Sequence, residues 1–301
     1  MSSHLPFPAA RPQAPRALPR WRSRLASVTA VAFLVVAATA CSDDTTSPAS
    51  RLVYGPSQVL GNGTARSYVV IGANGAPSSL GVAISETAMA NLPQTPMPGM
   101  PSAAMLSLSL PAQAATTGYN HVMLDWNPMG HEPDQVYTHP HFDFHFFQIT
   151  PAERDQLVPS NPQFWAKAGI FPGAEFVPTG FAPASVLANV PPANAAVPLM
   201  GMHWLDTSSP ELQPPPNNHM FTRTFIYGSY DGKFIFVEPM ITKAFIESAK
   251  SKAGGYSYPV SVPAKVATSG AYPASYSITY NASAHEYRIA LDGLVSKQAT
   301  P

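Results

Sequence analysis

The sequence of 301 residues contains a single cysteine, Cys41. No disulfide can form within the chain, so a folded domain must rest on its hydrophobic core or on a bound metal. Charged residues are also scarce, at 11% of the sequence, with 17 basic and 17 acidic side chains. No basic patch or Lys/Arg-rich helix is visible, which argues against nucleic acid as a partner.

Two catalytic signatures are missing from the sequence as well. There is no Gly-x-Ser-x-Gly elbow of a serine hydrolase. The segment Gly61-Asn62-Gly63 is not followed by the lysine and helix of a phosphate-binding loop. These absences argue against nucleophilic catalysis and nucleotide binding, so an enzyme of this sequence would depend on a metal.

The N-terminus has the pattern of a targeting segment. Residues 1–24 carry five arginines and no acidic residue, and Leu25 to Ala40 is a mostly apolar run that is too short and wrongly flanked to span a membrane. Small residues, Ala38 and Ala40, precede Cys41. Residues 1–40 resemble a bacterial lipoprotein signal peptide, which implies lipidation at Cys41. Ordinary cleavage without lipidation remains the alternative, because Ala38 stands where such signals usually have leucine.

The residues after Cys41 indicate the destination. Ser42, in place of an aspartate, implies by the same resemblance the outer membrane of the cell envelope, facing the periplasm. We expect residues 41–52 to form a flexible tether and residues 53–301 to form a single β-rich domain. Removing the five N-terminal arginines from 17 basic residues leaves 12 against 17 acidic ones. The mature protein is therefore mildly acidic, and the lipid would anchor it to the membrane.

Proline is abundant, at 34 residues, about twice its usual frequency. Many prolines fall between periodic segments, where they suit irregular, stiff loops and argue against a helical bundle. Three hairpins are predicted, which pair residues 68–71 with 80–85, 221–227 with 233–238, and 276–280 with 287–291. Three short helices are predicted, which begin at Thr150, Asn161 and Thr242. The sequence therefore predicts a mainly β, antiparallel sandwich or barrel with two or three short helices and long proline-rich loops.

One segment alternates polar and aromatic side chains. His139, His141, Asp143 and His145 would share one face of a strand, and the phenylalanines between them would pack into the core on the other face. Residues two apart on a strand are separated by about 6.6 Å and residues four apart by about 13 Å. One ion can therefore take a neighbouring pair, but not both His141 and His145, from a straight strand.

Four segments carry a resemblance to a known family: D-W-N-P-M-G-H-E-P-D-Q-V-Y, P-H-F-D-F-H-F, G-M-H-W-L-D, and I-Y-G-S-Y-D-G-K-F-I-F-V-E-P-M-I-T. They begin at Asp125, Pro140, Gly201 and Ile226. Together they resemble an uncharacterised family of exported bacterial proteins that share a domain of unknown function, over about residues 55–293. The resemblance implies an exported β-rich domain but no particular reaction. His139 lies outside the family pattern.

Six residues in these segments form the candidate metal set, namely His131, His141, Asp143, His145, His203 and Glu238. Imidazole and carboxylate groups are suitable ligands for Zn²⁺, Mn²⁺, Fe²⁺ or Cu²⁺. In an enzyme, Glu132, Asp143 or Glu238 would be the candidate base beside a metal-bound water. Asp143 has an alternative role, as an acceptor that orients a neighbouring imidazole. The segment Asp125 to Gly130 is most simply a turn with a packed indole.

Three hypotheses follow, from different classes of protein. The first is a lipid-anchored envelope protein that binds a metal ion or a small ligand through the histidine strand. The second is a metal-dependent enzyme built on the same side chains. The third is a structural or assembly protein without metal, in which the histidines only pack, because buried imidazoles are commonly satisfied by hydrogen bonds alone. Self-association into a homo-oligomer stays open.

Overall fold

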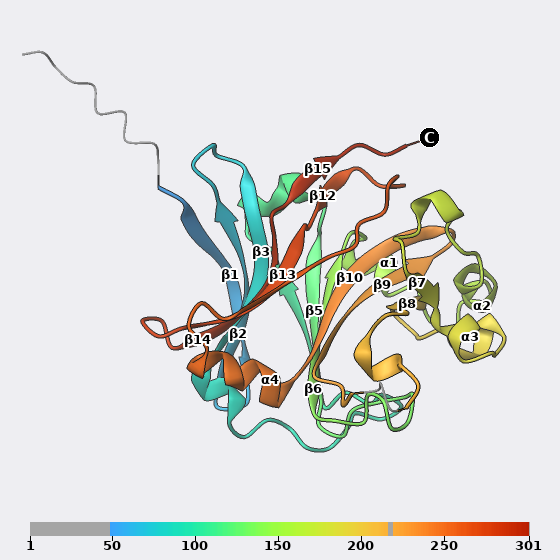
Figure 1. Cartoon of the computed structure of the whole chain (residues 1–301), viewed down its shortest axis with the longest axis horizontal. Helices are drawn as coiled ribbons and strands as arrows, with labels where there is room; N and C mark the ends of the chain where they lie inside the picture. The colour runs from blue at the N-terminus through green and yellow to red at the C-terminus, as the bar shows by residue number, and fades with distance from the viewer. Residues whose placement is uncertain (1–48, 216–218, 301) are drawn as a thin grey trace, which may run out of the picture. The chain divides into compact units, whose positions relative to one another are not determined.

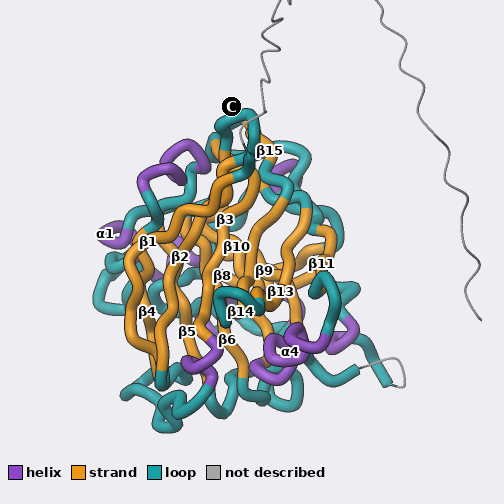
Figure 2. Tube along the Cα trace, turned by 90° about the vertical axis from the view of Figure 1, so that its left-hand side faces the viewer, coloured by secondary structure: helices purple, strands orange, loops and turns teal. Residues whose placement is uncertain are grey.

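Antiparallel strands dominate the part of the chain that the structure describes, residues 49–215 and 219–300 of a computed structural model. The predicted signal peptide, the predicted lipidation site at Cys41 and most of the predicted tether lie outside these residues. Two large sheets stack face to face, as Figure 1 shows, and Figure 2 shows their strands running in similar directions. The prediction of a mainly β fold is confirmed, and of the two architectures expected, the sandwich describes it.

The first sheet has six strands in the order β1-β2-β3-β14-β13-β11. Their bounds are β1 Arg51–Leu60, β2 Gly63–Ile71, β3 Pro77–Ser85, β14 Glu286–Asp292, β13 Ser275–Asn281 and β11 Tyr256–Pro259. Strands from the two ends of the described chain therefore meet in the middle of this sheet, where β3 pairs with β14.

The second sheet has seven strands in the order β4-β5-β6-β10-β9-β8-β7. Their bounds are β4 Ala104–Ser109, β5 His121–Asn127, β6 His141–Phe147, β10 Lys233–Thr242, β9 Arg223–Tyr230, β8 Met202–Asp206 and β7 Phe181–Pro183. A further pair, β12 Gly270–Tyr272 and β15 Val295–Lys297, forms a small sheet of its own.

Helices are short and lie in the connections. The α-helices are α1 Pro151–Arg154, α2 Phe164–Ala168, α3 Ala184–Leu187 and α4 Lys243–Ser248. Short 3₁₀ helices occur at Glu86–Met89, Ala112–Thr117, Ala174–Phe176, Pro192–Asn194, Pro210–Leu212 and Ala249–Ser251. In Figure 1, α1, α2 and α3 lie on the side of the seven-stranded sheet that faces away from the six-stranded one. None of the helices within residues 49–215 and 219–300 has the length and apolar character needed to cross a membrane.

The core lies between the two large sheets and follows the alternation of the strands. Phe142, Phe144 and Phe146 of β6 are fully buried in the same apolar cluster as Leu80 of β3 and Ile289 of β14. The prediction that the phenylalanine face packs into the core is therefore confirmed. Because successive side chains on a strand point to opposite faces, the histidines of β6 lie on the outer face of the seven-stranded sheet.

The three predicted hairpins are confirmed, as β2 with β3, β9 with β10, and β13 with β14. Two of the three predicted helix starts are confirmed. Thr150 and Glu153 form a reciprocal capping box at α1, and the hydroxyl of Thr242 accepts a hydrogen bond from the backbone N–H of Phe245 at α4. The second helix begins at Phe164, three residues later than Asn161, whose side chain accepts a hydrogen bond from the backbone N–H of Gln163.

Three expectations about local structure are wrong. His139 is not part of the histidine strand, because β6 begins at His141 and His139 lies in the preceding loop. Asp125 to Asn127 are not a turn but the last residues of β5. The strand that was expected to end at Glu238 continues through Pro239, since β10 runs to Thr242. Proline has no backbone N–H, and the ladder between β10 and β6 is interrupted there, between Val237 and Met240.

Candidate metal centre

The candidate site lies on the outer face of the seven-stranded sheet, where strand register aligns polar residues. Asp125 of β5 lies directly opposite Asp143 of β6. Val237 of β10 pairs with Phe146 of β6, and Met240 pairs with Asp143. This register places Glu238 of β10 opposite His145 of β6. His203 of β8 lies opposite Gly228 of β9, so no side chain stands between it and β10 at that level. Four strands that are distant in sequence thus contribute side chains to one surface.

All six residues of the predicted metal set come together, in two groups. The first group is His131, His141 and Asp143, and the second is His145, His203 and Glu238. In each group one ligand atom of every residue lies within 4.8 Å of the others. His141 and His145 fall into different groups, as expected for a straight strand. These histidine and carboxylate groups could hold a metal ion.

In the first group, two imidazoles face one carboxylate. His141 Nε2 lies 3.2 Å from Asp143 Oδ1, and His131 Nε2 lies 3.6 Å from Asp143 Oδ2. The other ring nitrogens are engaged by backbone carbonyls, because His131 Nδ1 lies 2.7 Å from the oxygen of Glu132 and His141 Nδ1 lies 2.7 Å from that of His139. A neutral ring that donates from Nδ1 keeps the lone pair of Nε2 free, which is the arrangement found in metal-ligating histidines.

The second group is more deeply buried. His145 Nε2 lies 3.5 Å from Glu238 Oε2, and His203 Nε2 lies 3.7 Å from the same oxygen. On its far side, His145 Nδ1 lies 3.4 Å from Oδ2 of Asp125. His145, Glu238 and Asp125 are almost inaccessible to solvent, and His203 is largely buried. His145 thus has the carboxyl group of Asp125 at one ring nitrogen and faces the Glu238 group with the other. This resembles the carboxylate–histidine–metal arrangement of zinc sites.

The spacings themselves carry information. Distances of 3.2 to 3.7 Å between these nitrogen and oxygen atoms are mostly too long for good hydrogen bonds. In a tetrahedral site with metal–ligand bonds of about 2.0–2.2 Å, neighbouring ligand atoms lie about 3.3–3.6 Å apart. The observed separations therefore fit ligands arranged around an ion better than they fit side chains that bond to one another.

Many buried polar atoms at the site have no hydrogen-bond partner among the described residues. They belong to Asp125, Asn127, His141, Asp143, His145 and Glu238. Buried polar groups are normally paired, and each orphaned one costs about 1–3 kcal/mol. Their concentration on one face of one sheet calls for a common partner.

The charges of the first group are coupled. Burial alone would raise the pKa of Asp143, but the imidazoles of His141 and His131 outweigh it and hold the pKa well below the usual value. Burial alone would lower the pKa of His131, and the Asp143 carboxylate reverses this and raises it. Either a proton or a metal cation is therefore favoured between these rings and the carboxylate.

In the second group, burial favours the neutral forms of all three side chains. Burial lowers the pKa of His145 to about 4, and burial together with His145 lowers that of His203 to about 3, so both rings are neutral at pH 7. Burial, followed by the negative charges of Asp143 and Asp125, raises the pKa of Glu238 well above its usual range. Neutral imidazoles are the form that binds a metal, and a cation would draw Glu238 into its ionised form.

Asp125 and Asn127 are members of the site that sequence reasoning missed. Asn127 Nδ2 donates a 2.7 Å hydrogen bond to Oδ2 of Asp143, which leaves Oδ1 to face His141. Burial and the nearby Asp143 raise the pKa of Asp125 well above its usual value. The signal was present, because Val122, Leu124 and Trp126 alternate with the polar residues of β5 and lie in the core. The Pro128-Met129-Gly130 turn signal obscured that alternation.

A large cavity, of about 830 Å³, opens onto the site. His131, Asp143, His145, His203 and Glu238 all line it. The third base candidate, Glu132, is exposed and also lines the cavity. Segments that include residues 184–200 form the rest of the wall. A molecule in the cavity reaches each group through its most exposed ligand, which is His131 in the first group and His203 in the second.

Comparison with known proteins gives one family match. The model of a family described as TTHB210-like, "Hypothetical protein TTHB210", matches residues 72–126, which run from the β2–β3 hairpin to the end of β5. Asp125 is the one residue of the site that this match includes. Neither the curated proteins nor the solved structures contain a match.

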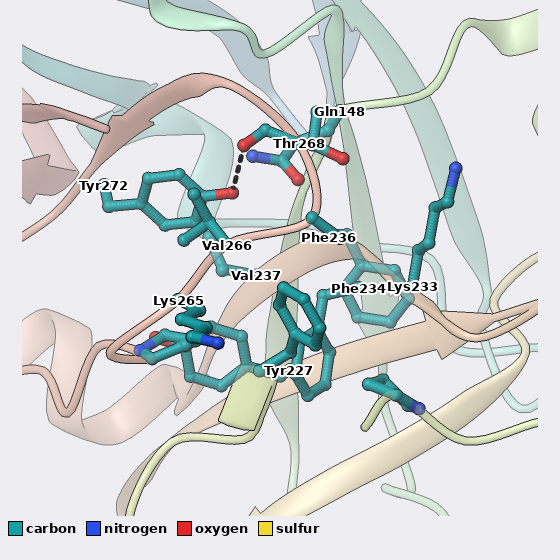
Figure 3. A pocket seen from close by; sticks show the side chains of 14 residues that line it. Gln148, Tyr227, Lys233, Phe234, Phe236, Val237, Lys265, Val266, Thr268 and Tyr272 are labelled. Carbon is teal, nitrogen blue, oxygen red and sulfur yellow. Dashed lines mark hydrogen bonds between the residues drawn. The ribbon is translucent and has the colours of Figure 1, made fainter. Parts of the chain in front are cut away.

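A second cavity is too small to compete as a ligand site. It measures about 20 Å³ and lies among Tyr227, Val237 and Tyr272, as Figure 3 shows. Tyr272 donates a 2.7 Å hydrogen bond to the carbonyl of Thr268 beside it. The side-chain nitrogen of Gln148, which also lines this space, has no partner among the described residues. The volume suffices for a single water molecule, which would satisfy that amide.

Proposed function

We propose that the protein is a lipid-anchored protein of the cell envelope that binds divalent transition-metal ions on the outer face of its seven-stranded sheet. The observation that carries the proposal is the convergence of two histidine pairs, each on one carboxylate, at distances of 3.2 to 3.7 Å. Unpaired buried nitrogen and oxygen atoms at both groups support it. Three ligands per group suit Zn²⁺, Mn²⁺, Fe²⁺ or Cu²⁺ with a coordination position to spare.

The test is elemental analysis of the mature, untagged protein after reconstitution with each of these four ions. We expect the wild type to hold near-stoichiometric metal, with one ion in each of the two groups. His141→Ala should lose the metal of the first group, His203→Ala that of the second, and the double variant should lose both. The matched control is His285→Ala, since that ring is 75% exposed and lies in the β13–β14 turn. Circular dichroism would establish that each variant is folded.

Removal of the metal should lower stability, because an ion that binds only the folded state stabilises it. At an ion concentration 1,000 times Kd the stabilisation is about 4 kcal/mol. We therefore expect a chelator to lower the Tm of the wild type and to leave that of the double variant unchanged. A wild type without metal, and with the same Tm in chelator, would instead favour the packing and assembly hypothesis.

The anchoring part of the proposal rests on the sequence pattern that ends at Cys41. Cys41→Ala removes the acceptor of the lipid, so we expect this variant to move from the membrane fraction to the soluble fraction. Ser42→Ala, next in the chain, is the control and should stay with the membrane. Equal distribution of Cys41→Ala and wild type would contradict lipid anchoring.

A metal-dependent enzyme is the second candidate, and the cavity over both groups favours it. Glu132, Asp143 and Glu238 remain the candidate bases. Glu132 alone of these is not a member of a metal group and is exposed at the cavity. Loss of turnover in Glu132→Gln with unchanged metal content would support this function.

A further inference from the structure

The chemical character of the large cavity narrows the class of molecule that can reach the metal groups. Its volume of about 830 Å³ lies in the range of small-molecule sites, which is about 300–1,000 Å³. One wall of the cavity is the polar face that holds both groups. The remainder is mostly apolar, with side chains that include Leu187, Val190, Met200, Leu205, Ile226 and Met240.

Within residues 49–215 and 219–300, the lining includes no lysine and no arginine. A phosphate, or a carboxylate away from the metal, would therefore lose its hydration in the cavity without gaining a cationic partner, which is costly. Charged substrates that need two anchoring points, such as sugar phosphates or dicarboxylates, do not fit this lining.

One aromatic side chain also lines the cavity. Tyr137 is 2% exposed, and its ring packs edge-on against that of His131, with ring centroids 6.0 Å apart. The hydroxyl oxygen of Tyr137 is inaccessible to solvent, so it offers a ligand in the cavity no hydrogen bond.

Helix α3 places exposed apolar side chains at and beside the cavity. Leu187, at the end of α3, lines the cavity and is 46% exposed to solvent. Val186, its neighbour in the chain, is 62% exposed. Exposed aliphatic side chains favour contact with an apolar molecule over a strongly hydrated one.

We propose that the metal centre binds a mainly apolar organic molecule through a head group that coordinates the metal by oxygen or nitrogen, with the apolar part in the cavity. This rests on the proposed metal binding, because three protein ligands in each group leave one or two positions for such a head group in a four- or five-coordinate site. No bond in the ligand is made or broken in the proposal, which concerns recognition alone.

The test uses three hydroxamate probes, titrated into the Zn²⁺-loaded full chain by calorimetry. Acetohydroxamic acid carries the metal-binding head alone, and octanohydroxamic acid adds six methylenes. The monohydroxamate of suberic acid has a tail of the same length with a carboxylate at its end. We expect the octano probe to bind about 50-fold more tightly than the aceto probe, as burial of about half the added methylenes predicts. The suberic probe should lose most of that gain.

A variant with a matched control localises the effect. Ala188 lines the cavity and is exposed, so Ala188→Trp should narrow the cavity and reduce the preference for the octano probe at least tenfold. Ala193 is equally exposed but does not line the cavity, and Ala193→Trp should keep the preference. Metal content and affinity for acetohydroxamic acid should not change in either variant.

The outcomes separate the two proposals. Stoichiometric metal with equal affinity for the octano and aceto probes would overturn the ligand class and leave metal binding intact. Equal affinity for the octano and suberic probes would overturn the argument from the missing cations. A protein that holds no metal after reconstitution would overturn both proposals, and elemental analysis of the same sample reveals that case.

Discussion

At the scale of single residues, Asp125 is the most informative side chain. Its carboxyl group is fully buried and has no hydrogen-bond partner among the described residues. Asp125 lies directly opposite Asp143 on the neighbouring strand. Two carboxyl groups in such an arrangement destabilise the metal-free fold, since only one of them ionises readily. An apolar residue at this position would stabilise the sheet, so the carboxylate points to a role toward His145 and a cation beyond it.

Asp125→Asn should therefore act in opposite directions on stability and on metal binding. We expect the metal-free variant to be more stable by about 1 kcal/mol, because an amide avoids the cost of burying an ionisable carboxyl group beside Asp143. Its metal affinity should fall about 10–100-fold, because an amide orients and polarises His145 less well. Chelator competition and chemical denaturation in chelator measure the two effects. Asp134→Asn, an exposed residue in the β5–β6 connection, is the control. Unchanged affinity would mean that Asp125 does not support the metal group.

At the scale of elements, a glycine in strand β9 leaves a space that a phenylalanine ring of β10 occupies. Gly228 lies between His203 on β8 and Phe236 on β10, and a Cβ atom at Gly228 would fall 1.9 Å from a carbon of the Phe236 ring. That ring packs edge-on against His145 and His203, at centroid distances of 5.0 and 5.6 Å. The missing side chain on one strand thus fixes the ring that supports both histidines.

Gly228→Ala should displace the Phe236 ring and destabilise the fold by about 1–3 kcal/mol, as overpacking does. Metal at the His145 group should be lost before metal at the His141 group. Thermal unfolding and elemental analysis measure these effects. The double variant with Phe236→Leu should recover part of the stability, because the smaller side chain vacates the space. Gly169→Ala, where a Cβ meets only ordinary contacts, is the control. A Tm equal to that of wild type in Gly228→Ala would contradict the argument.

The elements also explain what the sequence predicts and what it does not. Hairpins such as β9 with β10 and the helix start at Thr150 depend on neighbouring residues, so local patterns suffice. The alternation in β6 likewise assigns its two faces correctly. The pairing of β6 with β10 joins residues almost a hundred positions apart, and no local pattern encodes it. The division of the six ligands into two groups follows from that pairing.

At the scale of the whole molecule, a second polar network joins strands β1, β2 and β14 of the six-stranded sheet. Glu286 of β14 accepts hydrogen bonds from Tyr54 of β1 at 2.5 Å, from Arg66 of β2 at 3.1 Å, and from Arg288 at 2.7 Å. In contrast to the metal groups, this network is complete in itself. Burial alone would raise the pKa of Glu286, but hydrogen bonds from Tyr54, Arg288 and Arg66 lower it.

Glu286→Gln should lower the free energy of unfolding by about 2 kcal/mol at pH 7, since hydrogen bonds to a charged acceptor are lost. A lowered folded pKa means that this stabilisation is fully present above the unfolded value of 4.5 and is lost as pH falls through the folded value. The difference between wild type and variant should therefore shrink as pH falls below 4.5. Denaturation curves at several pH values measure it, with exposed Glu175→Gln as the control. A difference that does not vary with pH would contradict this account.

The candidate ligands and the cavity wall lie in different kinds of structural element, which has a consequence for how this protein can evolve. Five of the six candidate ligands are anchored in strands, whereas residues 184–200 of the cavity wall lie in α3 and the irregular segment after it. Connections of this kind tolerate substitution and insertion better than paired strands do. A library that randomises Leu187, Ala188 and Val190 should therefore sample new ligand selectivities while every member keeps the same candidate metal ligands.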